Sequence, residues 1–271
     1  MKKVIASFLM MTAAVTFAAD SQSLTGRTAE IYAKAKTGKF FADAEKLKPE
    51  IWPMTGAPSF LVIWHPAEKM PERWIVSLHG SNGFATDDLA IWSRHTRDRD
   101  VGLLCVQWWL ANGDSIESYL RPEQIHSELD SALHKLGVKP GNAMLHGFSR
   151  GSANSYPIAS LDAGHGKKYF SLCVASSGGV ATDYPPIRAI VEGRYGDHPL
   201  KGTRWITSAG GRDKNQERDG IPAMRRTAEW LEQQGASVLF RIEDPDFGHG
   251  ALVLNPVNAK RVLDEFLGAG K

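Results

Sequence analysis

The chain has 271 residues, of which 42% are hydrophobic and 23% charged. It is therefore long and apolar enough to bury a globular core, and its composition excludes an intrinsically disordered protein. Its formal net charge is only +2, and without Lys2 and Lys3, which begin an N-terminal leader, 30 basic residues balance 30 acidic ones. A neutral chain of this kind argues against nucleic acid as a partner, because such partners require an excess of positive charge.

The first 19 residues have the composition of a secretory signal peptide. Two lysines precede an apolar run from Val4 to Ala18, and small residues follow before Asp20. The run is too short to span a bilayer comfortably, so we expect cleavage near Ala18 or Ala19 and a secreted or periplasmic protein. An uncleaved anchor or a buried N-terminal helix is the alternative interpretation.

Beyond the leader, residues 20–55 have helical composition from Ser23 to about Leu47, with Thr28 as a candidate N-cap. Strand-length apolar runs then alternate with helix-length segments. The expected strands are 60–64, 74–78, 101–107, 143–145, 169–175, 204–207 and 237–242, and the expected helices are 87–98, 122–136, the segment after Ser149, 222–234 and 256–267. This alternation predicts an α/β fold for residues 56–271, with a mostly parallel central sheet and helices on both faces.

The two cysteines, Cys105 and Cys173, lie in apolar runs that we expect to be interior strands. In the expected layout two other strands separate them, which places them about 14 Å apart and beyond the reach of a disulfide. The sequence therefore predicts two buried free thiols.

The stretch from Gly147 to Gly151 reads Gly-Phe-Ser-Arg-Gly and lies between a short apolar run and a segment of small residues. A Gly-x-Ser-x-Gly sequence in a strand, turn and helix context holds the serine hydroxyl clear of the backbone. A hydroxyl is a weak nucleophile, so it must be exposed where a base can take its proton. Ser149 is therefore the candidate nucleophile.

An acid and a base follow the serine in chain order. Asp213 comes in a loop after one expected strand, and His249 comes in a loop after the last one. Loops at the carboxyl ends of parallel strands converge at one edge of the sheet, where distant residues can meet. Asp219 lies in the same loop as Asp213 and is an alternative acid, and Asp183, after the preceding strand, is a third.

The order Ser149, Asp213, His249, together with a His79-Gly80 turn after an earlier strand, resembles the α/β-hydrolase superfamily. The resemblance extends over roughly residues 60–267 and implies the α/β-hydrolase fold. Within the superfamily the chain looks most similar to small esterases, including the polyhydroxyalkanoate-depolymerase and feruloyl-esterase group.

The resemblance also implies roles for individual residues. Ser149 would attack a carbonyl carbon, His249 would accept its proton, and Asp213 would fix the imidazole tautomer, with no metal or cofactor. In the family the developing oxyanion meets two backbone N–H groups. These would come from Arg150 and from Gly80 or Ser81, between which the sequence does not decide.

Substrate selection must come from other loops. Trp108 and Trp109 follow a strand and would form an aromatic wall beside the serine, or would pack in the core. The segment 184–195 would form a small cover. We expect a serine hydrolase acting on small-molecule or polymeric carboxylic esters, with a peptidase, an acyltransferase or a non-catalytic binding module as alternatives.

Overall fold

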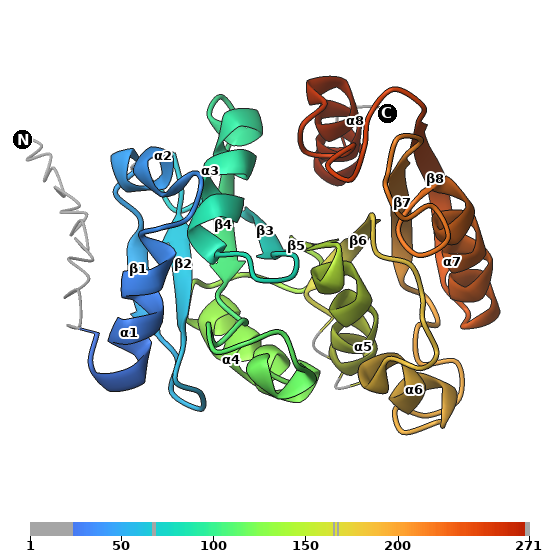
Figure 1. The fold of residues 1–271 in the computed structure, drawn as a ribbon, viewed down its shortest axis with the longest axis horizontal. Coiled ribbons are helices and arrows are strands. Elements are labelled where there is room, and N and C mark those ends of the chain that lie inside the picture. Colours follow the sequence, from blue (N-terminus) through green and yellow to red (C-terminus); the bar gives the residue numbers. More distant parts are fainter. Residues whose placement is uncertain (1–23, 67–68, 165, 167, 269–271) are drawn as a thin grey trace, which may run out of the picture.

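The computed structural model describes residues 24–66, 69–164, 166 and 168–268, so the predicted signal segment lies outside the described residues. Eight strands form one sheet in the order β1-β2-β4-β3-β5-β6-β7-β8 (Figure 1). Strand β2 runs antiparallel to both of its neighbours, and every other neighbouring pair is parallel. The strands are β1 (Glu50–Pro53), β2 (Phe60–Trp64), β3 (Arg73–Leu78), β4 (Val101–Val106), β5 (Ala143–Phe148), β6 (Phe170–Ser176), β7 (Arg204–Gly210) and β8 (Ser237–Asp244).

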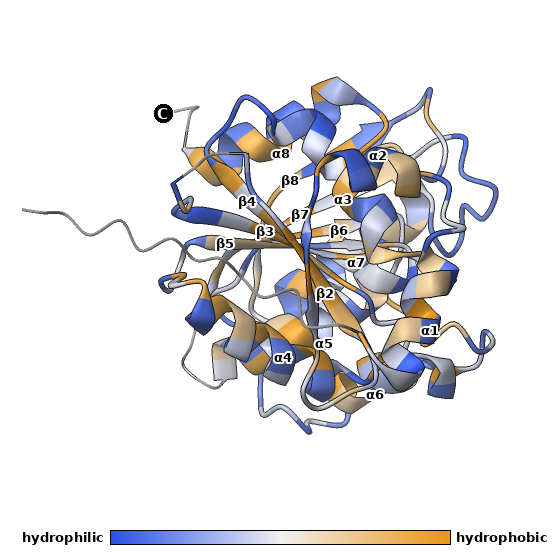
Figure 2. Cartoon of the chain, turned by 90° about the vertical axis from the view of Figure 1, so that its left-hand side faces the viewer, coloured by the Kyte–Doolittle hydropathy of each residue, from blue (hydrophilic) through white to orange (hydrophobic). Residues whose placement is uncertain are grey.

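Helices cover both faces of this sheet. One face carries α1 (Gly26–Ala35), α2 (Phe41–Lys46), α3 (Ala85–Thr96) and α8 (Pro256–Leu267), and the other carries α4 (Pro122–Lys135), α5 (Arg150–Gly164), α6 (Pro185–Val191) and α7 (Ile221–Gln233). Figure 2 shows apolar strands between α2, α3 and α8 on one side and α4, α5 and α6 on the other.

Alternation along β3 shows how one strand serves both layers. Trp74, Val76 and Leu78 belong to the apolar cluster shared with α4 and α5, whereas Ile75 belongs to the cluster shared with α3 and α8. Successive side chains of a strand point to opposite faces, so a strand buried on both faces reads as a continuous apolar run. The predicted α/β architecture is confirmed.

The structure differs from the expectations at three places. The described part of the segment 20–55, from residue 24 onward, forms two helices but also supplies β1, which pairs antiparallel with β2 at the sheet edge. Helix α1 begins at Gly26, and Thr25 occupies its N-cap position without a side-chain capping bond, so the expected cap, Thr28, lies inside the helix. Helix α6 lies in the segment 184–195, where we expected a cover but no helix. Pro185 and Pro186 are compatible with the first turn of a helix, because their missing N–H groups would have no intrahelical acceptor there.

The cysteine prediction is confirmed. Cys105 in β4 and Cys173 in β6 are both free and buried, and strands β3 and β5 lie between them. Of the helices in the part of the chain that the structure describes, none has the length and apolar character needed to cross a bilayer.

Candidate active site

Ser149 occupies the sharp turn between β5 and α5. Its φ is +55°, a left-handed conformation that costs a non-glycine residue roughly 1–2 kcal/mol. Its N–H donates a hydrogen bond of 2.8 Å to the carbonyl of Ser176, which anchors the turn to β6. A Cβ added to Gly147 would collide with the backbone of Gly151, and one added to Gly151 would collide with the carbonyl of Leu78. The two glycines are thus required by close packing of strand, turn and helix.

His249 and Asp213 form a short hydrogen bond at the same edge of the sheet. The Nδ1 of His249 lies 2.6 Å from the Oδ2 of Asp213. The other carboxylate oxygen accepts the N–H of Asn215 at 3.0 Å, and the Asp213 side chain is only 3% exposed. Since a carboxylate oxygen accepts, Nδ1 carries the proton, and Nε2 of the neutral ring is left as an acceptor.

The imidazole lies beside the nucleophile turn. The rings of His249 and Phe148, the residue directly before Ser149, approach edge to face with centroids 4.9 Å apart. The residues that the sequence places on three separate loops are therefore gathered at one end of β5, β7 and β8.

The second carboxylate in this loop, Asp219, is close but bonded differently. Polar atoms of Asp213, Asp219 and His249 all lie within 4.8 Å of one another, and the guanidinium Nε of Arg218 is 3.6 Å from Asp219. Burial raises the pKa of Asp219. The three groups are near enough to ligate a metal ion, but the hydrogen bond already uses Nδ1 of His249 and Oδ2 of Asp213. Of the three candidate acids, Asp213, Asp219 and Asp183, it is Asp213 that is bonded to the imidazole.

The turn after β3 packs directly on the serine. A Cβ added to Gly80 would lie 3.2 Å from the Cβ of Ser149, so only hydrogen occupies this space. Buried His79 donates from Nδ1 to the Gly80 carbonyl at 2.8 Å, while the Trp108 indole donates to the His79 carbonyl at 3.0 Å. Burial lowers the pKa of His79 to about 4, which keeps the ring neutral and suited to this structural role.

Arg150 is the first residue of α5, so its N–H has no acceptor within the helix and lies at the positive end of the helix dipole. Its guanidinium pairs with Asp114 at 3.0 Å and lies 4.4 Å above the ring of Tyr119. The hydroxyl of Tyr119 accepts the N–H of Asn82 at 3.0 Å, which ties the same loop to the turn after β3. Ser81, the other expected oxyanion donor of that turn, is exposed.

The expected aromatic wall is wrong for Trp108. Its side chain is fully buried and stacks on His79 with ring centroids 5.5 Å apart, so it supports the turn from within the core. Trp109 is half-buried, packs against Phe84 and donates from its indole to the carbonyl of Gly113 at 2.7 Å. Neither tryptophan lines the two cavities described next.

Two cavities lie beside the candidate site. A cavity of about 320 Å³ is lined by Ser149, Arg150, Gly178 and Asp219. A second cavity, of about 550 Å³, shares two lining residues with the first, Tyr184 and Pro185. The segment 184–195, expected as a cover, thus lies between and around the two cavities. Sequence reasoning missed Asn154, which lines the larger cavity and carries no recognisable motif.

Solved structures share this architecture. An esterase from Pyrobaculum calidifontis superposes with a TM-score of 0.60 at 14% identity, covering 91% of this chain and 94% of that one. A carboxylesterase from Mesorhizobium loti gives 0.56 at 18% identity, covering 78% and 95%. The acylaminoacyl peptidase of Pyrococcus horikoshii gives 0.57 at 14% identity, covering 81% of this chain but 41% of the peptidase.

No family model matches the sequence, and no curated protein matches it either. The structural likeness, together with the mostly parallel sheet and its two helical layers, shows that the chain has the α/β-hydrolase fold. This confirms the fold that the resemblance implied.

Proposed function

We propose that the protein is a serine hydrolase that cleaves carboxylic esters through an acyl-enzyme. The observation that carries the proposal is the hydrogen bond of 2.6 Å between His249 and Asp213, located beside a serine held at a φ of +55°. The fold and the names of its structural neighbours, an esterase and a carboxylesterase, support the same reaction class.

In the proposed mechanism Ser149 attacks the ester carbonyl while Nε2 of His249 takes the hydroxyl proton. Asp213 holds the proton of Nδ1 and stabilises the imidazolium that forms. The negative charge that develops on the carbonyl oxygen is met by the N–H of Arg150 and by an N–H of the Gly80–Ser81 turn. His249 then returns its proton to the leaving alcohol, and water releases the acid by the same steps in reverse order.

Three alternatives use the same fold. A peptidase would apply the same groups to an amide, as the name of the peptidase neighbour illustrates, and an acyltransferase would use an alcohol in place of water. A binding module would not need a buried carboxylate paired with a histidine beside a strained serine.

We also propose that the protein is secreted or periplasmic, on the basis of the predicted leader at residues 1–19.

A fluorophosphonate probe tests the proposal. Wild-type protein is expected to be labelled, and Ser149→Ala is expected to lose labelling and to lower ester turnover on the order of a million-fold. Ser152→Ala is the matched control, because that hydroxyl is fully buried and donates to the carbonyl of Gly178 at 2.8 Å. An unlabelled wild-type protein would favour the binding module. Comparison of para-nitrophenyl butyrate with the corresponding anilide separates an esterase from a peptidase.

A further inference from the structure

The loop of residues 108–120, between β4 and α4, contacts both segments that carry the proposed oxyanion donors. Backbone hydrogen bonds close this loop on itself, because the N–H groups of Leu110 and Leu120 donate to the carbonyls of Ser118 and Trp108, each at 2.8 Å. Tyr119 lies at the end of the loop and is buried, with its ring 4.7 Å from the ring of Trp108. Since Trp108 is itself fully buried, the position of Tyr119 is fixed by the core.

The hydroxyl of Tyr119 holds the turn after β3. In this turn the N–H of Gly83 donates to the carbonyl of Gly80 at 3.1 Å, and Asn82 has a φ of +53°, which is characteristic of the third residue of a type II turn. Turn types I and II differ by a flip of the peptide between the second and third residues, here Ser81 and Asn82. The N–H of that peptide donates to the Tyr119 hydroxyl at 3.0 Å. Ser81 and Asn82 are both exposed, so this hydrogen bond, rather than core packing, fixes the peptide.

The ring of Tyr119 faces the segment that carries the other donor. The guanidinium of Arg150 lies 4.4 Å above this ring, and its Nη1 pairs with Oδ1 of Asp114 at 3.0 Å. The same Oδ1 lies 3.1 Å from the Tyr119 hydroxyl, so Asp114 is bonded to both the tyrosine and the arginine. Burial raises the pKa of Tyr119, so the hydroxyl stays protonated and can donate to Asp114 while it accepts from Asn82. Tyr119 therefore connects the turn after β3 to the first residue of α5.

We propose that Tyr119 is a positioning residue for the oxyanion hole. Its hydroxyl holds the turn after β3 and its ring holds Arg150, so two backbone donors on separate segments keep the spacing that one developing oxyanion requires. The proposal rests on the proposed hydrolase mechanism and adds to it a residue that acts through the donors. Donors lower the barrier only when they are held where the charge develops, so loss of the Tyr119 hydroxyl is expected to lower kcat and to leave KM nearly unchanged.

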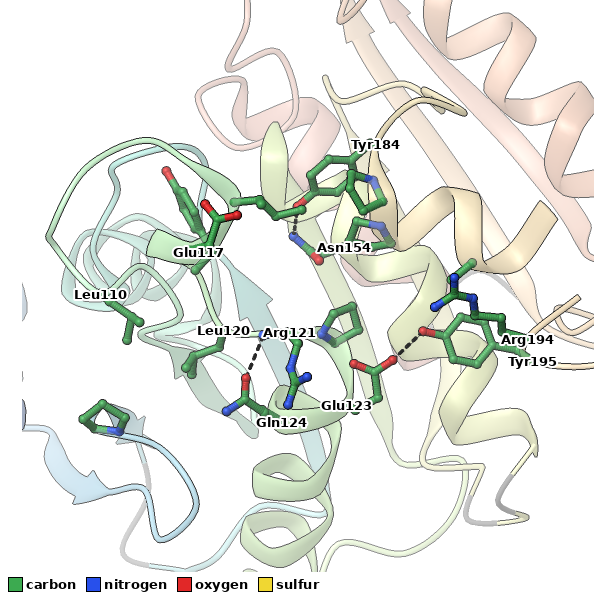
Figure 3. A pocket seen from close by; sticks show the side chains of 17 residues that line it. Leu110, Glu117, Leu120, Arg121, Glu123, Gln124, Asn154, Tyr184, Arg194 and Tyr195 are labelled. Atoms are coloured by element: carbon green, nitrogen blue, oxygen red, sulfur yellow. Dashed lines mark hydrogen bonds between the residues drawn. The ribbon is translucent and has the colours of Figure 1, made fainter. Parts of the chain in front are cut away.

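Tyr119→Phe tests the proposal, because it removes the hydroxyl and keeps the ring. For para-nitrophenyl butyrate we expect kcat to fall about tenfold, which is less than the roughly 10²- to 10³-fold lost when a donor itself is removed. Tyr195→Phe is the matched control. Tyr119 and Tyr195 both line the larger cavity, but the Tyr195 hydroxyl donates to Glu123 at 2.8 Å (Figure 3), and its loss is expected to change neither constant. A raised KM with unchanged kcat in Tyr119→Phe would make Tyr119 a substrate contact and would overturn the proposal.

Inhibition by a trifluoromethyl alkyl ketone separates oxyanion binding from general stability. In the adduct Oγ of Ser149 bonds to the ketone carbon, the hydroxyl proton passes to His249, and the ketone oxygen becomes the oxyanion. The inhibition constant is expected to rise about tenfold in Tyr119→Phe, in step with the fall in kcat/KM. The alcohol of the same chain forms no adduct, so it is expected to bind wild type and variant equally. Equal inhibition of both proteins by the ketone would overturn the proposal.

Arg150→Met tests the other half of the connection. It keeps the backbone N–H of residue 150 but removes the cation from the Tyr119 ring and from Asp114, so kcat is again expected to fall, by about three- to tenfold. Because both side chains act through one network, the double variant is expected to lose less than the product of the two single losses. Thermal melts identify a variant that fails to fold, in which case the other variant decides.

Fluorophosphonate labelling keeps this proposal distinguishable from the proposed function. A labelled, active protein whose kcat and ketone inhibition are unchanged in both Tyr119→Phe and Arg150→Met would overturn the role of Tyr119 and leave the hydrolase proposal standing. A wild-type protein that is neither labelled by the fluorophosphonate nor inhibited by the ketone would overturn both.

Discussion

Replacement of Asp213 by Asn provides the most informative perturbation of the candidate site, because it changes a single buried atom. The carboxylate oxygen that faces His249 at 2.6 Å would become an NH₂ group or would turn away from the ring. If the amide donates to Nδ1, the ring proton moves to Nε2, and the imidazole can no longer take the proton of Ser149. The other oxygen can still accept the N–H of Asn215, so the loop is expected to keep its shape.

The magnitude follows from two contributions. Loss of a charge-assisted hydrogen bond costs about 1.5–3 kcal/mol, which corresponds to a factor of about 10 to 150 in rate. The wrong tautomer supplies the rest of the loss, and in serine proteases the equivalent substitution lowers kcat by about 10⁴-fold in total, or about 5.4 kcal/mol. We therefore expect kcat for para-nitrophenyl butyrate to fall by about 10³ to 10⁴, with little change in KM.

Asp219→Asn is the matched control in the same loop. Asp219 contributes charge near His249 but does not hold its Nδ1 proton, so the rate is expected to stay within about tenfold of wild type. Steady-state kinetics of both variants, with circular dichroism to verify folding, decide the matter. A wild-type rate in Asp213→Asn together with an inactive Asp219→Asn would refute the assignment of the acid.

Two further predictions concern stability. Gly151→Ala is expected to lower the free energy of unfolding in urea by at least about 2 kcal/mol, because the added Cβ collides with the carbonyl of Leu78. Gly164→Ala is the control, since the space around its Cβ is open, and it is expected to change stability by less than about 1 kcal/mol. Equal effects of the two substitutions would contradict the packing argument. Burial raises the pKa of Asp88 to about 7, so between about pH 4 and pH 7 the folded state keeps a proton that the unfolded state releases. As pH rises through this range, the carboxyl therefore lowers the free energy of unfolding by up to about 1.4 kcal/mol per pH unit. His146, whose pKa is lowered to about 3, changes stability in the opposite direction below pH 6.5, so the test compares the unfolding free energies of Asp88→Asn and wild type at each pH. The difference is expected to increase in favour of the variant up to pH 7 and then to level off. A difference that does not change with pH would contradict a buried neutral carboxyl.

Much of the fold could be predicted because apolar runs in the sequence indicate which segments are buried. The expected helix 256–267 coincides with α8 and the expected strand 60–64 with β2. Hydropathy does not record pairing direction, so the antiparallel setting of β2 was not predictable. Strand β1 was not predicted because it is only four residues long and lies at the sheet edge. It is stabilised by pairing with β2 and does not show an alternating hydrophobic pattern of its own.

The candidate site shows a similar division. The sequence predicts that Ser149, Asp213 and His249 lie close together, because each follows a strand and the carboxyl ends of these parallel strands lie at one edge of the sheet. The choice between Asp213 and Asp219 is not readable, since both lie in one loop and the path of the backbone decides which carboxylate meets the imidazole. The hydrogen bond between Asn154 and Tyr184 joins residues 30 positions apart in the chain, so no local pattern predicts it.

The most direct measurement is acid quenching of the protein during hydrolysis of para-nitrophenyl acetate, followed by mass analysis of its peptides. The proposed mechanism predicts one added acetyl group on the peptide that contains Ser149, at a level that falls as substrate is exhausted. Steady turnover with Ser149 unmodified, or with the acetyl group on a different side chain, would contradict it.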